Sequence, residues 1–239
     1  MIVVTFAFAI LFALVHLGIG VLRFLDKTPR SRWLSAAGGI AVAYVFLHVL
    51  PELSSHRDTF ADALNTSGGT AEDIVYGLAF AGLAAFYGLE RVVKRSRKKN
   101  AQPDGTAGAF WLHIGSFAVY NFIIGYLLLH REEGGLRSLL FYGTAMTVHF
   151  ITNDFSLRSD HKARYDHLAR WILAGAVLAG WLMGYAITIS ETAIGMLFAF
   201  LAGGVVLNVL KEELPEERES RFVPFLLGGA GYMALLLAI

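Results

Sequence analysis

The sequence predicts an all-α membrane protein with a single transmembrane domain, residues 1–239. Of its 239 residues, 56% are hydrophobic and only 16% are charged, which is too little polar material to cover a water-soluble protein of this size. The apolar residues gather in eight stretches of about 20 residues, the length that crosses a bilayer as a helix. No stretch alternates apolar and polar residues as a strand does, so each is expected to be helical.

The eight expected transmembrane helices are separated by short polar joints. They cover residues 1–23, 33–53, 72–90, 109–130, 138–158, 167–189, 192–211 and 222–239. The first run is apolar from Met1 to Leu22 and is followed, not preceded, by basic residues. We therefore expect a retained helix and not a cleaved signal peptide.

Basic residues are distributed unevenly over the joints, and this asymmetry predicts the orientation. The joints after the first, third, fifth and seventh spans, with their helix ends, carry seventeen Lys and Arg residues, whereas the opposite side carries only Arg57, Arg131 and Arg137. Because basic residues are retained on the cytoplasmic side, both termini are expected to lie outside. We expect an integral protein of the plasma (inner) membrane.

The longest joint, residues 91–108, begins RVVKRSRKKN and is expected to be a basic cytoplasmic loop. Such a run can bind nucleic acid, but beside a helix end it is explained by topology and by attraction to anionic lipid head groups. The lipid bilayer, and no nucleic acid, is the expected partner. The chain has no cysteine, which excludes disulfides and thiolate metal ligands.

Small residues at every fourth position let membrane helices pack closely. Two spans have this spacing, the third with Gly77, Ala81 and Ala85, and the sixth with Ala176, Gly180 and Gly184. We expect both stripes at contacts between helices.

The span 138–158 carries the most informative polar pattern. Residues at offsets 0, 3, 4, 7 and 11 share one helical face, namely His149, Thr152, Asn153, Ser156 and Asp160. The stripe is either half of a hydrated path or a line of interhelical hydrogen bonds, and the sequence leaves both open. Asp154 lies about 140° from His149 around an ideal helix and does not belong to the stripe.

Four more ionisable residues lie in the spans or at their ends, namely His16, His48, Glu52 and His113. Each is a functional candidate because an unpaired charge inside a bilayer costs about 3 kcal/mol or more. For His16 we favour the ordinary alternative, a neutral imidazole bonded to a neighbouring backbone carbonyl.

The fourth span places Tyr120 and Asn121 at the depth of His149. Asn121 lies about nine residues from the outer end of its span and His149 about eleven, so both are roughly 15 Å deep at 1.5 Å per residue. Two antiparallel neighbours then present these side chains and Asn153 near the bilayer midplane. Transporters commonly bind their substrate at this depth.

The triplet Leu-Pro-Glu occurs at residues 50–52 and again at residues 214–216, near the ends of oppositely oriented spans. An inverted repeat places matching prolines in this way. We therefore expect helices 1–3 and 6–8 to be inverted halves on either side of helices 4 and 5.

These features resemble the ZIP family of zinc and iron transporters, which have eight helices, both termini outside, and metal sites between helices 4 and 5. HVLPEL at residues 48–53 is similar to the family's His-x-x-Pro-Glu segment, and GGVVLNVLKEELPEE at residues 203–217 is similar to the seventh-helix segment ending in Glu-x-x-Pro-Glu. Residues 120–125 align with the motif His-Asn-x-x-Glu-Gly, and residues 149–154 with His-x-x-Pro-Glu-Gly. Three usual metal-binding positions differ, because Tyr120 replaces a histidine and Ile124 and Asn153 replace glutamates.

The resemblance implies a transporter whose substrate is a divalent metal cation, zinc or similar, with no catalytic residue and no resident cofactor. The implied metal site comprises His149, Asn153, Asn121 and Tyr120. The implied transport pathway comprises His48, Glu52, Thr152, Ser156, Asp160 and His113. Transport toward the cytoplasm follows from family analogy alone.

Two other functions stay open. Neutral ligands hold a divalent cation less well than carboxylates, so the chain is alternatively a non-transporting relative that acts as a sensor, scaffold or partner subunit. The less favoured alternative is an intramembrane metal-dependent hydrolase, with zinc bound by Asp154, Asp160, His161, Asp166 and His167. Nearby Lys162, Arg164 and Arg170 disfavour a cation there, so we do not expect an enzyme. A homodimer stays open.

The orientation is tested by cysteine labelling, since the chain has no native cysteine. A Lys98→Cys variant should resist an impermeant maleimide in intact cells and react after permeabilisation. Arg57→Cys should react without permeabilisation. Ready labelling of Lys98→Cys from outside would show that the orientation is wrong.

Overall fold

The structure is a computed structural model that describes residues 1–21, 32–100, 107–131, 135–213 and 221–238. Within these residues the chain is all-helical, and a helix lies at each of the eight expected ranges. The main helices are α1 (Ile2–Gly18), α2 (Arg32–Tyr44), α3 (Leu50–Leu64), α4 (Gly68–Asn100), α5 (Ala107–Leu127), α6 (Leu136–Asp160), α8 (Arg170–Ala186), α9 (Glu191–Glu213) and α10 (Phe222–Ala238). Shorter helical segments complete them: η1 (Ile19–Val21), η3 (Val45–Val49), α7 (Lys162–Arg164) and η4 (Tyr165–Ala169).

Several of these helices have the length and composition of membrane spans. Six helical stretches among the described residues are long and apolar enough to cross a bilayer, and α10 is a shorter apolar helix. α6 is outside this group although it has 25 residues, and it is the helix that carries Asp154 and the polar stripe. The composition of the chain is therefore that of an integral membrane protein.

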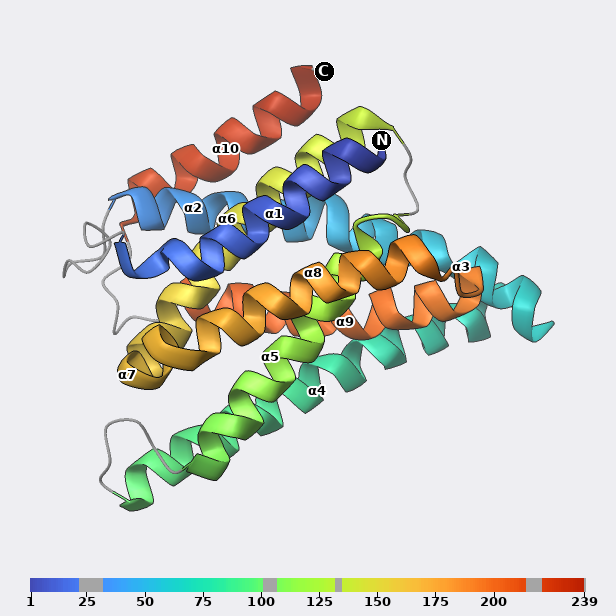
Figure 1. Cartoon of the computed structure of the whole chain (residues 1–239). Coiled ribbons are helices and arrows are strands. Elements are labelled where there is room, and N and C mark those ends of the chain that lie inside the picture. The colour runs from blue at the N-terminus through green and yellow to red at the C-terminus, as the bar shows by residue number, and fades with distance from the viewer. Residues whose placement is uncertain (22–31, 101–106, 132–134, 214–220, 239) are drawn as a thin grey trace.

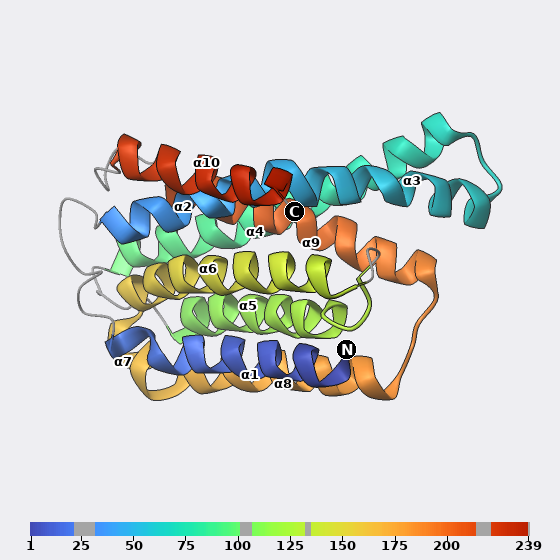
Figure 2. The same ribbon diagram turned by 90° about the horizontal axis from the view of Figure 1, so that it is seen from above.

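The helices form one bundle in which α1 begins and α10 ends at the same end (Figure 1). α5 packs most extensively on α8, α2 on α10, and α4 on α9. α6 packs on α1 and α2. α3 and the first turns of α4 extend beyond the other helices at one end (Figure 2).

Two helices run further than the sequence predicts. α2, η3 and α3 form one continuous helix from Arg32 to Leu64, where a span ending at residue 53 was expected. It stops at Asn65, which adopts a left-handed conformation with φ 47°, a common way to end a helix. The turn at η3 is a π-helix just before Pro51, where the wider turn accommodates the missing backbone N–H.

The expected basic loop, residues 91–108, begins as helix because α4 continues to Asn100. Lys and Arg are good helix formers, and positive charge is favourable at a helix C-terminus. The first helix breaker after Gly88 is Pro103, in a segment outside the described residues. The loop prediction is therefore wrong for residues 91–100.

Three pairs of helices touch backbone to backbone through glycine. A Cβ atom built on Gly39 of α2 would lie 1.9 Å from the Phe225 carbonyl oxygen of α10, and one on Gly203 of α9 would lie 1.8 Å from the Ala79 carbonyl oxygen of α4. On α8, a Cβ at Gly180 would lie 2.0 Å from the Phe122 carbonyl oxygen of α5. Only glycine fits these positions without moving a helix.

The two predicted small-residue stripes have different outcomes. Gly180 and Gly184 lie against α5, as expected. The stripe in the third span is wrong, because nothing lies within 4 Å of a Cβ built on Gly77, and Ala81 and Ala85 are exposed. α4 instead meets α9 through Ala79 and Gly82, a neighbouring face that the spacing alone could not distinguish.

Gly203→Ala should destabilise the fold by about 1–3 kcal/mol, because its methyl group has no room against the α4 backbone. Gly88→Ala on α4 is the control, since a Cβ at that position meets nothing within 4 Å and alanine favours the helix. Thermal unfolding in detergent should show a lower midpoint for the first variant only. Equal midpoints would mean that the α4–α9 contact does not need glycine.

Candidate functional site

α5 and α6 face each other across a layer of long polar side chains. Tyr120 of α5 and His149 of α6 are joined by a hydrogen bond of 2.9 Å between the phenol oxygen and Nε2. The Tyr142 hydroxyl of α6 donates to the Ile124 carbonyl of α5 at 3.4 Å. Few close backbone contacts join α5 and α6 in the described part of the chain, so side chains fill the space between them.

The predicted residues of this layer are buried, and several of their polar atoms lack partners. The Asn121 amide donates from Nδ2 to the Phe117 carbonyl of its own helix at 2.7 Å. Asn121 Oδ1, His149 Nδ1 and Asn153 Nδ2 are buried without a hydrogen-bond partner among the described residues. Rotating an Asn amide by 180° exchanges its oxygen and nitrogen, so either asparagine can present an oxygen. A buried polar atom without a protein partner is a place where a ligand or water can bind.

A close contact between two buried ionisable side chains, which the sequence does not predict, joins α1 and α6. His16 Nδ1 of α1 lies 2.6 Å from Asp154 Oδ2 of α6, and both side chains have 0% exposure. The prediction that His16 bonds a backbone carbonyl through its side chain is therefore wrong. Asp154 does face away from the His149 stripe, as its helical angle indicates, and that direction leads to α1. The sequence did contain a signal for this pair, because His16 and Asp154 are ionisable residues that both lie in the cytoplasmic halves of their spans, the first and the fifth.

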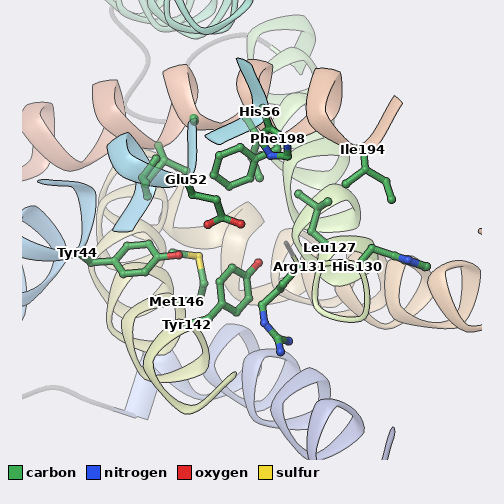
Figure 3. Close-up of a pocket in the computed structure, with 14 residues that line it drawn as sticks. Tyr44, Glu52, His56, Leu127, His130, Arg131, Tyr142, Met146, Ile194 and Phe198 are labelled. Atoms are coloured by element: carbon green, nitrogen blue, oxygen red, sulfur yellow. The ribbon is translucent and has the colours of Figure 1, made fainter. Parts of the chain in front are cut away.

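A cavity opens toward the other end of α5 and α6, near Glu52 (Figure 3). It is lined by α2, α3, α5, α6 and α9, and the Glu52 carboxylate points into it between Tyr44 and Tyr142. An adjoining cavity of about 230 Å³ is lined by His48 and again by Glu52. His48 Nδ1 lies 3.1 Å from the Tyr232 hydroxyl of α10. His48 and Glu52 thus line adjoining cavities at this end of α5 and α6, and their place on a transport pathway stays a prediction.

Three basic residues of this cavity were not predicted as part of a site. His56, His130 and Arg131 line it together with Glu52. The Arg131 side chain donates from Nη1 to the Leu128 carbonyl at 2.6 Å, and burial lowers the pKa of this guanidinium from its usual value, although arginine stays protonated. The spacing of His56 four residues after Glu52 was the signal for its place on the same helical face.

The other four residues of the predicted pathway do not belong to one connected set of contacts. They are Thr152, Ser156, Asp160 and His113. Thr152 donates to the His149 carbonyl of its own helix at 3.0 Å, and Ser156 is buried. Asp160 ends α6 and is partly exposed. His113 belongs to a separate network, because its Nδ1 lies 3.1 Å from His161 Nε2 and its Nε2 lies 3.5 Å from Glu90.

The members of the acidic and histidine cluster considered for a hydrolase have separate partners. Asp154 contacts His16, His161 contacts His113, and Asp166 accepts two hydrogen bonds from Arg158 at 2.7 and 3.0 Å. No group of three or more His, Asp or Glu side chains that could hold a metal occurs among the described residues. Nothing in this geometry assembles a zinc centre at that end.

Comparison of the chain with protein-family models gives no match, and comparison with curated proteins gives none. The resemblance to ZIP transporters therefore rests on the residues and helices described above.

Asp154→Ala should destabilise the protein by about 3 kcal/mol or more, because it leaves a buried imidazole without its partner. The double variant His16→Gln with Asp154→Asn keeps polar groups of similar size and should lose less than the sum of its two single variants. Unfolding in detergent measures the stability of Asp154→Ala, of the double variant and of its two single variants. Strictly additive losses would show that His16 and Asp154 do not stabilise each other.

Proposed function

We propose that this chain is a ZIP-like membrane transporter homologue that moves a divalent metal cation, zinc or similar, through the polar layer between α5 and α6. The observation that carries the proposal is the set of buried atoms without partners on Asn121, His149 and Asn153. A passing cation bound by imidazole nitrogen and amide oxygens would satisfy atoms that the protein leaves unpaired.

The ligand chemistry sets the strength of this site. His149 supplies one nitrogen, Nδ1 without rearrangement or Nε2 when the Tyr120 hydroxyl moves away. Asn121 and Asn153 supply neutral oxygens, so dehydration of a divalent ion is only partly offset. The nearest acid along α6 is Asp154, whose Oδ2 lies 2.6 Å from His16 Nδ1 and is therefore already engaged. Binding should therefore be weaker than at a site with two glutamates.

The cavity around Glu52 is the outer entrance in this proposal. A carboxylate there attracts cations, and Arg131 at the same cavity opposes it. The cation then passes the Tyr120–His149 bond and leaves along Ser156 and Asp160. The hydrogen bond between Tyr120 and His149 is the barrier that must open for transit.

The glycine contacts support an inverted repeat with eight membrane-spanning helices. A rotation that exchanges α2 with α9, and α4 with α10, turns the α2–α10 contact into the α9–α4 contact. Both contacts are made by glycine against a backbone carbonyl of the partner. Pro215, which the repeat would pair with Pro51, and the Glu-x-x-Pro-Glu segment extend into residues 214–220, outside the described part of the chain.

A second function is favoured by the composition of the same layer. The family's histidine and glutamates are replaced by Tyr120, Ile124 and Asn153, and Ile124 has 0% exposure inside the core. Tyr120 also occupies His149 Nε2, which leaves Nδ1 as the only ring nitrogen of His149 that could bind a metal without rearrangement. A non-transporting sensor, scaffold or partner subunit is consistent with such a closed layer.

Metal uptake into proteoliposomes separates the two functions. Wild-type protein should take up zinc or cadmium, and His149→Ala should lose the signal because no other side chain of the layer offers a strong ligand. The double variant Ile124→Glu with Asn153→Glu should bind metal more tightly because it adds two carboxylates.

The matched control is His167→Ala, a histidine on the exposed end of the bundle, which should leave uptake unchanged. Wild-type uptake that is insensitive to His149→Ala would refute the site assignment. If neither the wild-type protein nor the carboxylate variant binds metal, the non-transporting function is the better one.

A further inference from the structure

A groove between the C-terminal ends of α4 and α9 concentrates positive charge beside an apolar surface. It is lined by the cations Arg91, Lys94, Arg95 and Lys211, by one acid, and by the uncharged Tyr87 and Leu207. The acid, Glu90, is already bonded by Lys211 at 3.0 Å and lies 3.7 Å from Lys94. Arg91 and Arg95 make no ion pair among the described residues. The groove therefore keeps a net positive charge that suits an anion.

The same face of α4 continues away from the groove as an exposed aromatic stripe. Tyr76, Phe80 and Tyr87 are 43%, 69% and 54% exposed. At 100° per residue, these three side chains fall within about 60° of Arg91 and Lys94 around the helix. One stripe thus begins with aromatic rings and ends with cations.

The dimensions of this stripe match one leaflet of a bilayer. Phe80 and Arg91 are eleven residues apart, which is about 16 Å along a helix, and half of the hydrocarbon core is about 15 Å. An acyl chain lying on the aromatic rings would bring its phosphate to the arginines. Free phosphate has no group that would use the aromatic part of the stripe.

We propose that the α4–α9 groove is a binding site for one anionic phospholipid, with the phosphate held by Arg91 and Arg95 and an acyl chain lying along Phe80 and Tyr87. The charge bias of the sequence assigns this end to the cytoplasmic leaflet, where such lipids attract basic residues. Lys211 is fixed by Glu90 and forms the opposite wall on α9.

The test is a lipid titration of the purified full-length protein by native mass spectrometry. Phosphatidylglycerol and phosphatidylcholine with the same acyl chains are the two lipid probes, and inorganic phosphate is added as a competitor. Wild-type protein should prefer phosphatidylglycerol. Arg91→Gln with Arg95→Gln should weaken that binding roughly thirtyfold, since each of the two cations contributes about 1 kcal/mol near an anionic surface. Arg91→Lys with Arg95→Lys should restore most of it.

The matched control removes two exposed cations elsewhere at the same end of the bundle, Arg32→Gln with Lys162→Gln, and should keep the preference. Unfolding in detergent without lipid verifies that each variant is folded. Equal binding of the two lipids by the wild-type protein would overturn the proposal, as would an equal loss in the control variant. Displacement of phosphatidylglycerol by millimolar phosphate would identify a phosphate site instead of a lipid site.

Discussion

The hydrocarbon core of a membrane offers no water, so the polar groups on α1, α5 and α6 must bond to one another or to something that enters the bundle. His16 and Asp154 bond to each other at 2.6 Å. Tyr120 and His149 do the same at 2.9 Å. Asn121 and Asn153 form no hydrogen bond to a polar side chain among the described residues, and one polar atom of each stays unsatisfied, as do His16 Nε2, Asp154 Oδ1 and His149 Nδ1. What sets the layer between α5 and α6 apart is that it offers amide oxygens beside an imidazole nitrogen, a set of ligands that a cation can use.

The packing of the helices explains why that layer lies between α5 and α6. Glycine brings α2 against α10, α4 against α9, and α5 against α8, each backbone to backbone. Such contacts leave no space for a ligand. Between α5 and α6 the contacts are made by side chains, which can change rotamer without moving a helix. The same frame places Glu52 in the cavity at one end of the gap (Figure 3).

The sequence predicts the helices well because apolar length and periodicity are local properties. It predicts their ends less well, since residues 91–100 were assigned to a loop although nothing in that segment breaks a helix. The helical angle of Asp154 correctly separated it from the His149 stripe. Its partner could not be found in this way, because the angle gives a direction and only the packing of α1 shows that His16 lies there.

The glycine contacts also show which properties the sequence predicts and which depend on how the helices pack. The spacing of Gly180 and Gly184 pointed to a real contact with α5, whereas that of Gly77 pointed away from the bundle. Small residues at every fourth position show that a helix can approach a neighbour closely. They do not show which face has a neighbour.

The central claim is that a divalent cation binds in the unsatisfied layer between α5 and α6. The most direct measurement is the anomalous scattering of crystals grown with cadmium. The expected result is a cadmium peak within coordination distance of a His149 ring nitrogen and beside Asn121 or Asn153. A cadmium peak confined to Glu52 and His56, with the Tyr120–His149 hydrogen bond intact, would contradict the claim.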